Sequence, residues 1–372
     1  MKNVGCRIFF ILHPTVYILH PTAMTPRVHL TIVAWNSLRY LPELLASVEA
    51  QTFRDFQAFI IDNGSVDGSE AYVRAHHPRV AYLRNARNLG FAAAHNQGIR
   101  YALSHWPSDD LARRYALVVN PDVILAPDFL EKIVAAADAH PEAGSLGGKL
   151  LRASRERLED EDLRETVKSD VIDSTGLRGT RARTVADRGA GELDRGQYDA
   201  LTDVFGISGA LALYRASALE DVKVDEEYFD ADFFAYKEDV DLAWRLRLAG
   251  FSALFVPEAR AHHHRAMGGS ESAGAFKRLR ERFGRSQARS GYSARNHWNM
   301  LMKDELFVNG LLASPWILCR EALQLAYVAV FETRNLGAFV QALARLPRML
   351  RKRREIMRSR KASAKEMRKW FV

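Results

Sequence analysis

The sequence has 372 residues, of which 48% are hydrophobic and 26% are charged, as in an ordinary folded protein. Its net charge of +8 is concentrated in residues 345–372, which carry twelve basic and two acidic residues. The rest of the chain is therefore slightly acidic, which argues against a nucleic-acid-binding protein with a basic face and favours contact of the C-terminal region with an anionic membrane surface.

Two cysteines, Cys6 and Cys319, are too few for a disulfide framework and indicate a reducing compartment. The apolar stretch 8–19 is shorter than the roughly 20 residues that a transmembrane helix needs, and Pro14 interrupts it. We expect residues 1–24 to be an N-terminal extension that is disordered or not native. The predicted domain begins at residue 25.

Short apolar runs alternate with segments of helical spacing from residue 28 onward. The predicted strands are 30–34, 56–61, 80–83 and 116–119, and the predicted helices are 38–51, 68–76, 91–102 and 127–139. This alternation is typical of βαβ units, so the sequence predicts an α/β fold with a mostly parallel, doubly wound sheet flanked by helices.

The pattern loosens between residues 151 and 200, where the charged run 156–165 reads as a solvated helix or mobile loop and a short strand ends at 173–176. Further on, the elements expected are a glycine-containing strand at 204–214, a helix after the acidic cluster in 229–249, and a strand at 253–256. Beyond Tyr292 the pattern is helical. We expect 306–331 to form a helical hairpin lying on a membrane, with a soluble helical cap as the alternative.

Polar side chains follow the predicted strands at the point where each strand ends. Asp62 and Asp67 follow the second strand, and Asn120 and Asp122 follow the fourth. In an open α/β sheet this edge binds ligands, so Asp62 is placed to accept from a pyrimidine N3–H and Asp67 to approach a ribose. Asp122 suits a divalent cation bridging a diphosphate. Tight turns and helix capping are the alternatives for these residues.

Two further groups carry candidate chemistry. Glu238 and Asp239 precede a helix, where a carboxylate can take a proton from an acceptor hydroxyl, although acids also cap helices there. The run His262–His264 follows the last strand and could add an imidazole to the metal site, or lie in a surface loop.

Taken together, these segments resemble the inverting family-2 glycosyltransferases. The motifs that carry the resemblance occur in the expected order over residues 28–300: 33–36 (VAWN), 61–68 (IDNGSVDG), 84–91 (RNARNLGF), 120–122 (NPD), 206–210 (GISGA) and 238–242 (EDVDL). The resemblance implies a GT-A fold, divided into a nucleotide-sugar half at 28–122 and an acceptor half at 200–270. The rhamnosyltransferase-like branch is the most similar, and its usual donor is dTDP-L-rhamnose.

The resemblance also implies roles for individual residues. The residues expected to bind the nucleotide sugar are Val33, Asn36, Asp62, Asp67, Arg84, Asn88, Gly90, Asn96 and Asn120. Asp239 would be the catalytic base, Glu238 would orient the acceptor, and Gly209 and Arg245 would lie on the acceptor side. The metal, Mg²⁺ or Mn²⁺, would bind Asp122 and His263, with His262 and His264 as open alternatives. Asn120 stands where the family usually has the first aspartate of Asp-x-Asp.

The sequence therefore predicts a metal-dependent inverting glycosyltransferase that moves a sugar onto a glycan or polyprenyl-linked acceptor. It would be cytoplasmic and peripherally bound to the inner face of the plasma membrane through residues 301–372. A transferase for UDP-linked N-acetylglucosamine, galactose or galactofuranose is the nearest alternative. A nucleotidyltransferase is disfavoured because Ala34-Trp35-Asn36 replaces its glycine-rich loop. A non-catalytic glycan- or nucleotide-binding module is the third hypothesis.

Overall fold

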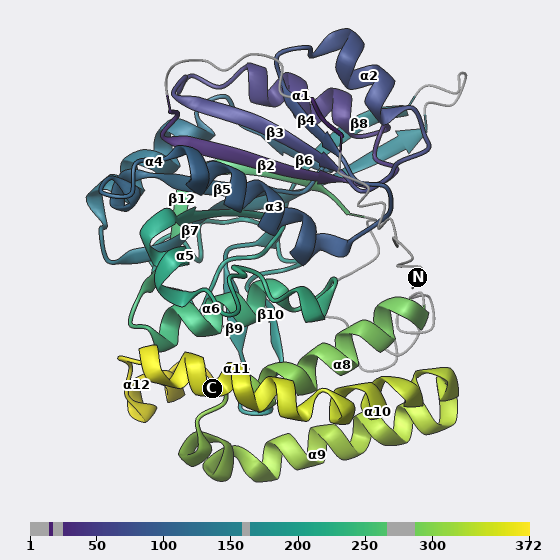
Figure 1. The fold of residues 1–372 in the computed structure, drawn as a ribbon, viewed down its shortest axis with the longest axis vertical. Coiled ribbons are helices and arrows are strands. Elements are labelled where there is room, and N and C mark those ends of the chain that lie inside the picture. The colour runs from purple at the N-terminus through teal and green to yellow at the C-terminus, as the bar shows by residue number, and fades with distance from the viewer. Residues whose placement is uncertain (1–14, 18–24, 158–163, 266–286) are drawn as a thin grey trace, which may run out of the picture.

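The computed structural model describes residues 15–17, 25–157, 164–265 and 287–372 (Figure 1). Its centre is a ten-stranded sheet in the order β1-β4-β3-β2-β5-β11-β7-β12-β6, with β8 paired to β7. The strands are β1 (Thr15–Tyr17), β2 (Val28–Ala34), β3 (Phe56–Asp62), β4 (Ala81–Arg84), β5 (Tyr115–Val119), β6 (Val123–Leu125), β7 (Ala143–Arg157), β8 (Arg164–Ser174), β11 (Leu211–Arg215) and β12 (Ser252–His264). Strands β2 to β5, β7 and β12 run in one direction, which confirms the mostly parallel sheet.

Helices cover both faces of this sheet. One face packs against α1 (Leu41–Glu49), α2 (Ser69–His76) and α4 (Phe129–Ala139), and the other against α3 (Gly90–His105), α5 (Ala216–Val222) and α6 (Glu238–Leu248). Strand β5 is buried on both faces: Leu117 and Val119 pack into one hydrophobic core, and Ala116 and Val118 pack into the other. A strand buried on both faces reads as a continuous apolar run.

The register of the parallel strands aligns the polar residues that follow them. Ala34 of β2 lies opposite Asp62 of β3, and Asp62 lies opposite Arg84 of β4. The sheet therefore delivers these side chains to a single edge, as expected for parallel strands.

One expectation for the middle of the chain was wrong. Residues 143–174 form the long antiparallel pair β7–β8, with 158–163 outside the described residues, in place of a loosely ordered segment. Strand β12 accompanies β7 as far as Ala153, and beyond that point the ladder of β7 is formed with β8 alone. A two-stranded extension has little core to fill, so its sequence lacks the apolar pattern of a buried strand. The small sheet of β9 (Leu177–Gly179) and β10 (Val185–Asp187) follows.

The chain end forms a separate helical layer below the sheet (Figure 1). It comprises α8 (Gln287–Asp304), α9 (Phe307–Phe331), the short 3-10 helix η3 (Thr333–Asn335), α10 (Leu336–Ala344), α11 (Leu346–Ser359) and α12 (Ala364–Arg368). The 3-10 helices η1 (Leu111–Arg113) and η2 (Ala231–Phe233) come earlier in the chain. The hairpin expected at 306–331 was wrong, because α9 is one continuous helix that contains Pro315. Pro315 has no N–H for the carbonyl of Leu311, and the Ser314 hydroxyl donates to that oxygen at 2.8 Å instead.

Buried charges attach this helical layer to the rest of the protein. The ammonium of Lys303 on α8 lies 2.6 Å from Asp230 and also pairs with Asp241. Lys352 on α11 lies 2.6 Å from Asp230 and 2.9 Å from Asp232. Since both lysines are almost fully buried, these pairs fix the C-terminal helices against the start of α6.

At the other end of the chain, part of the expected N-terminal extension takes part in the fold. Strand β1 pairs antiparallel with β4 at the sheet edge. Cys6 and the rest of residues 1–24 lie outside the described residues. In the part of the chain that the structure describes, no helix is both long and apolar enough to cross a membrane.

Candidate active site

Asp62 ends β3 and is completely buried. One carboxylate oxygen accepts from the Ser65 N–H at 2.8 Å, and the other accepts from the Tyr82 hydroxyl at 2.9 Å. The Arg84 guanidinium lies 3.6 Å away and donates to Glu70 at 2.7 Å. Asp62 thus lies at the expected strand end, with both oxygens already bonded inside the protein. Its contact with a base stays a prediction.

Asp67 joins the loop after β3 to the loop after β2. Its Oδ2 accepts from the Leu38 N–H at 2.8 Å, and its Oδ1 accepts from the Ser69 N–H and hydroxyl. These hydrogen bonds hold the pKa of Asp67 below its usual value although partial burial acts in the opposite direction. Asn36, which has a φ of 51°, adds a second link because its side chain accepts from the Val66 N–H at 2.9 Å. Val33 lies in β2 just before this loop and is half-buried.

The segment that begins α3 connects the two halves of the domain. The Asn88 side chain accepts from the Gly90 N–H at 2.8 Å. Gly90 has a φ of +83°, and a Cβ there would lie 2.4 Å from the carbonyl oxygen of Phe234. Asn96 is buried and bonds the backbone of Phe229 with both ends of its amide, at 2.9 and 2.7 Å. Asn96 therefore has a positioning contact in the structure, and its expected nucleotide contact stays untested.

Asp122, just before β6, and His263 of the adjacent strand β12 lie next to each other, as expected for two residues predicted to bind one metal ion. His263 Nε2 lies 3.2 Å from Asp122 Oδ1, and its Nδ1 lies 2.8 Å from Asp173 Oδ2. Burial opposes a charge on His263, but the two carboxylates outweigh it and raise the pKa of His263 to about 9. Likewise, the contact with His263 overcomes burial and holds the pKa of Asp122 below its usual value. Asp173 is thus the second carboxylate that contacts His263. From the sequence, it was assigned only to the end of a short strand.

The alternation of a strand explains why one histidine of three reaches Asp122. His262, His263 and His264 are consecutive in β12, so neighbouring side chains point to opposite faces. His264 lies 2.9 Å from Glu43 of α1 instead, and its ring packs 5.2 Å from that of Tyr40. His262 is half-buried, and burial lowers its pKa to about 4.

The expected catalytic base lies at the start of α6. Asp239 Oδ2 accepts from the Gly209 N–H at 2.9 Å, and Asp239 Oδ1 accepts from the Val240 N–H at 2.8 Å. The neighbouring Asn120 N–H donates to the Ala210 carbonyl at 2.9 Å, so the end of β5 is tied to the loop that holds the base. A Cβ at residue 209 would lie 3.1 Å from that of Asp239, which explains the glycine.

Glu238 and Arg245 lie on the same helix in different environments. Glu238 is buried, and its Oε2 has no hydrogen-bond partner among the described residues. Burial, followed by the adjacent Asp239, raises the pKa of Glu238 to about 8. Arg245 is buried too, but it bonds Asp241 and the carbonyls of Val222 and Tyr228. Arg245 holds the acceptor half together in this structure, and its expected acceptor contact is untested.

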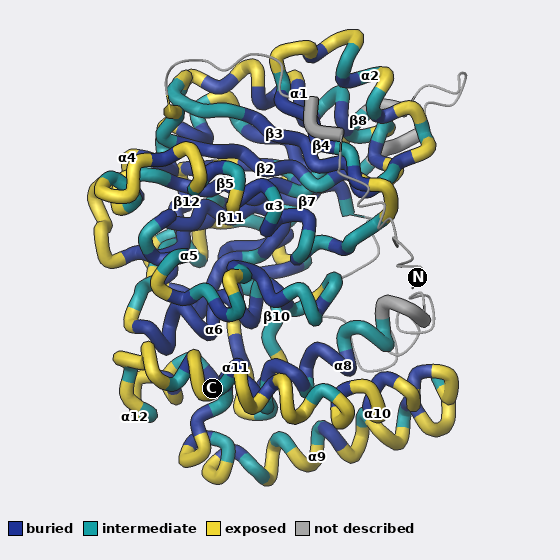
Figure 2. Tube along the Cα trace, in the orientation of Figure 1, coloured by how far each residue is buried: buried dark blue, intermediate teal, exposed yellow. Residues whose placement is uncertain are grey.

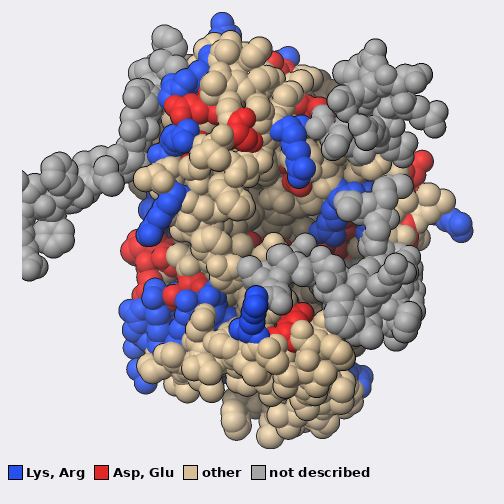
Figure 3. All heavy atoms as spheres, turned by 90° about the vertical axis from the view of Figure 1, so that its right-hand side faces the viewer, with Lys and Arg blue, Asp and Glu red and all other residues tan. Residues whose placement is uncertain are grey.

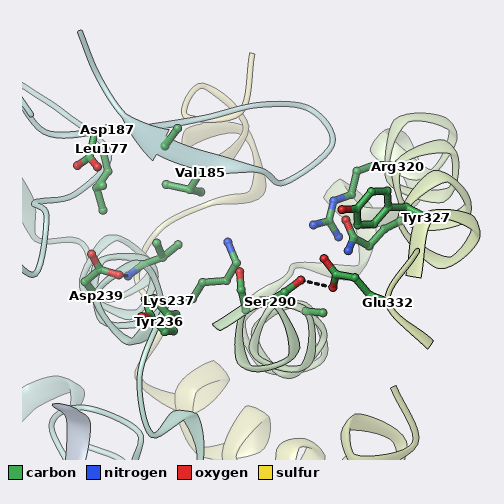
Figure 4. A pocket seen from close by; sticks show the side chains of 15 residues that line it. Leu177, Val185, Asp187, Tyr236, Lys237, Asp239, Ser290, Arg320, Tyr327 and Glu332 are labelled. Carbon is green, nitrogen blue, oxygen red and sulfur yellow. Dashed lines mark hydrogen bonds between the residues drawn. The ribbon is translucent and has the colours of Figure 1, made fainter. Parts of the chain in front are cut away.

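A cavity of about 280 Å³ opens beside Asp239 (Figure 4). It is bounded by the β9–β10 hairpin, the start of α6 and the helices α8 and α9. Asp187, at its inner end, is near both Asp173 and Asp239; burial and these two carboxylates raise its pKa against the opposing pull of Arg265. Sequence reasoning missed Asp187 and the cavity cations Lys237 and Arg320, because no local motif marks them.

Comparison with known proteins identifies the family. The family model described as glycosyl transferase family 2 matches residues 30–223, more than half of the chain. The chain belongs to this family. The protein is therefore a glycosyltransferase, which sets aside the nucleotidyltransferase and the non-catalytic binding module.

Two relatives are rhamnosyltransferases by name. The N-acetylglucosaminyl-diphospho-decaprenol L-rhamnosyltransferase of Mycobacterium tuberculosis is 28% identical over 257 residues, 65% of this chain and 78% of its own length. Rhamnosyltransferase WbbL of Escherichia coli is 26% identical over 239 residues, 64% of this chain and 83% of its own. This glycosyltransferase is thus rhamnosyltransferase-like.

Similarity to a solved structure supports the GT-A fold. The crystal structure of GalNAc-T7 with UDP, GalNAc and Mn²⁺ superposes with a TM-score of 0.51 at 13% sequence identity. The match covers 74% of this chain and 48% of the other. At this identity it supports the fold alone.

Proposed function

We propose that this glycosyltransferase transfers L-rhamnose from dTDP-rhamnose, with inversion, to a hydroxyl of a cell-surface glycan or a polyprenyl-linked saccharide. The observation that carries the proposal is the position of Asp239, which accepts a hydrogen bond from Gly209 and lines a polar cavity. The names of the two relatives support rhamnose as the sugar and, for one of them, a lipid-diphosphate-linked acceptor.

Asp239 acts as the general base in this proposal. Its carboxylate takes the proton of the acceptor hydroxyl while that oxygen bonds to the anomeric carbon. The bond from the anomeric carbon to the nucleoside diphosphate breaks in the same displacement, and its electron pair leaves with the diphosphate. A single displacement by one oxygen inverts the anomeric centre. The hydrogen bond from Gly209 keeps the base in place.

Asp122 and His263 fit a divalent cation. Their facing atoms lie 3.2 Å apart, close enough for one ion to take both, and Asp173 fixes the orientation of the imidazole. The described residues contain no group of three such side chains that would hold an ion unaided. Such a sparse set is typical of a cation that also binds substrate phosphates, and Mn²⁺ or Mg²⁺ suits it. When bound, the cation would neutralise charge on the leaving diphosphate.

Titration calorimetry with sugar nucleotides tests the donor. We expect dTDP-rhamnose to bind in the presence of Mn²⁺ or Mg²⁺, and EDTA to weaken binding by at least about tenfold, equivalent to about 1.4 kcal/mol. UDP-N-acetylglucosamine, UDP-galactose and UDP-galactofuranose should bind more weakly. Tighter binding of one of these would replace rhamnose by that sugar, and metal-independent binding would contradict the role of Asp122 and His263.

We also propose that the helical layer lies on an anionic membrane. Helix α9 buries two polar residues, Asn309 and Glu321, while most of its large apolar residues face outward. The large apolar residues more than half exposed on α9 and α10 include Phe307, Leu311, Leu318, Leu323, Val340 and Leu343. Figure 3 shows this lower end of the molecule as mostly uncharged, and Figure 2 shows α9 as largely exposed. Lipid is the environment in which such a face is stable.

Basic residues next to this face favour anionic lipid. Arg348, Arg351 and Arg354 of α11 are exposed, and each basic residue near an anionic surface can add about 1 kcal/mol. We expect the full chain to sediment with vesicles containing phosphatidylglycerol at low salt. The double variant Leu318→Glu and Leu323→Glu should stay in the supernatant, while Arg334→Gln, which removes one exposed charge, should still sediment. Wild-type protein in the supernatant would overturn this proposal.

A further inference from the structure

The lining of the cavity beside Asp239 includes two basic side chains from different segments of the chain. Lys237 precedes α6 and Arg320 belongs to α9, and both line the cavity (Figure 4). The Lys237 ammonium makes no hydrogen bond or ion pair within the described parts of the chain. Arg320 pairs with its neighbour Glu321, whose carboxylate also binds His297 and Trp298. Lys237 and Arg320 thus line one cavity, and Glu321 is the carboxylate paired with Arg320.

Three carboxylates, those of Asp187, Asp239 and Glu332, also line the cavity. Burial, followed by Arg320, lowers the pKa of Lys237 to about 8, although Asp239 and Glu238 act in the opposite direction. The other acids that line the cavity have their own partners. Glu332 accepts from Ser290 and Asn335 at 2.6 and 2.7 Å, and Asp187 lies 3.4 Å from Arg265. Among the described residues, Lys237 is therefore the cation of this cavity that is left to meet an anion from outside, with Arg320 in the same lining.

We propose that Lys237 and Arg320 bind the phosphate of a lipid-linked acceptor. This inference rests on the proposed function, and it names the group by which the acceptor is held. A phosphate or diphosphate matches two converging cations because it offers several acceptor oxygens. Asp239 lines the same cavity, so a sugar attached to that phosphate would have its hydroxyls near the base.

The anion belongs to the acceptor, because the lining of the cavity comes from the acceptor half and the C-terminal helices. Every described residue that lines it comes from 177 onward, and none comes from 28–122. The position of Arg320 on α9 is the reason to expect a lipid chain on the acceptor. Trp316 and Leu323, four residues before it and three after it, are 46% and 67% exposed, so they lie beside Arg320 on the apolar outer face. A chain attached to the phosphate could pass from the cavity directly onto this face.

Binding of farnesyl diphosphate, farnesol and inorganic pyrophosphate to the full-length protein in detergent tests the proposal. We expect farnesyl diphosphate to bind at least about tenfold more tightly than either of the other two. Lys237→Gln and Arg320→Gln should each remove most of that advantage, whereas Arg334→Gln, which neutralises an exposed arginine of the same helical layer, should keep it. Thermal unfolding of each variant checks that it is folded.

Three outcomes would overturn the proposal. Equal binding of farnesyl diphosphate and farnesol would exclude the phosphate site, and equal binding of pyrophosphate would exclude the lipid. A loss of dTDP-rhamnose affinity in both cation variants, with farnesyl diphosphate affinity unchanged, would assign the cations to the donor. Failure of wild-type protein to bind any sugar nucleotide would instead contradict the proposed function, and the farnesyl diphosphate titration would still decide the anion site.

Discussion

The backbone N–H of Gly209 donates to Oδ2 of Asp239 across 2.9 Å, and a side chain at residue 209 would be tight against Asp239. An added Cβ would lie 3.1 Å from the Cβ of Asp239 and 3.4 Å from its Oδ2. We expect Gly209→Ala to shift the base and to lower kcat by about tenfold, equivalent to about 1.4 kcal/mol. Donor affinity should stay the same. Steady-state kinetics would contradict this account if KM for the donor rose while kcat did not fall.

Asp239→Asn should remove the base without removing the fold. The amide keeps the shape and can still accept from Gly209, but it cannot take the acceptor proton. We expect kcat to fall by about 10²–10⁴-fold, the usual contribution of a general base, with unchanged binding of the donor. Asp221→Asn, at an exposed position, is the matched control and should retain activity. Undiminished transfer by the Asp239 variant would exclude it as the base.

Asp173 should matter through His263. Because its carboxylate lies 2.8 Å from Nδ1 of His263, it fixes the ring with Nε2 toward Asp122. We expect Asp173→Asn to weaken Mn²⁺ binding by about 10–100-fold, as for other groups behind a metal-bound histidine. Activity should recover at high Mn²⁺ concentration. Mn²⁺ affinity measured by electron paramagnetic resonance would refute the role if the variant matched the wild type.

The buried ion pairs of the helical layer should contribute to stability. Lys352→Met leaves Asp230 and Asp232 with less compensation, so we expect a loss of about 3–5 kcal/mol in the free energy of unfolding. Arg348 pairs with the same Asp232 at 2.8 Å but is half exposed. Arg348→Met should therefore cost less than about 1 kcal/mol. Equal losses in urea denaturation would show that burial is not the deciding factor.

Glu238 should make stability depend on pH. Its folded pKa of about 8 lies above the ordinary value of 4.5, so the folded state disfavours the charged carboxylate. The folded protein then loses stability as pH rises from about 4.5 to about 8, and Glu238→Gln escapes this loss. We expect the variant to be close to the wild type at pH 5 and to be more stable at pH 8.5 by about 3–5 kcal/mol. A difference that is the same at both pH values would contradict the shifted pKa.

The sequence was sufficient for the elements whose pattern is local. The parallel strands could be predicted because each is a short apolar run that ends in polar residues, as at Asp62 and Asn120. The choice of His263 depended on its distance from Pro257, and the structure does place that ring beside Asp122. In contrast, the strand at 143–157 was missed because its end, beyond Ala153, pairs with β8 alone and needs no apolar pattern.

The rest of the candidate site depends on contacts between distant segments. Asp173 reaches His263 across 90 residues of sequence, and Lys237 and Arg320 line one cavity although they are 83 positions apart in the chain. No short motif records such contacts. The family motif also misleads where a residue is buried, since Asn96 and Arg245 bond backbone groups inside the protein. Motifs of this kind combine residues that touch substrate with residues that hold the site in shape.

The most direct test of the account is release of nucleoside diphosphate by the full-length enzyme. Purified protein would be given Mn²⁺, a lipid-linked acceptor and either dTDP-rhamnose or one of the UDP-sugars. We predict release from dTDP-rhamnose that stops with EDTA and falls by at least about 10²-fold in Asp239→Asn. Release that continues at full rate in Asp239→Asn, or that occurs from a UDP-sugar and not from dTDP-rhamnose, would contradict the account.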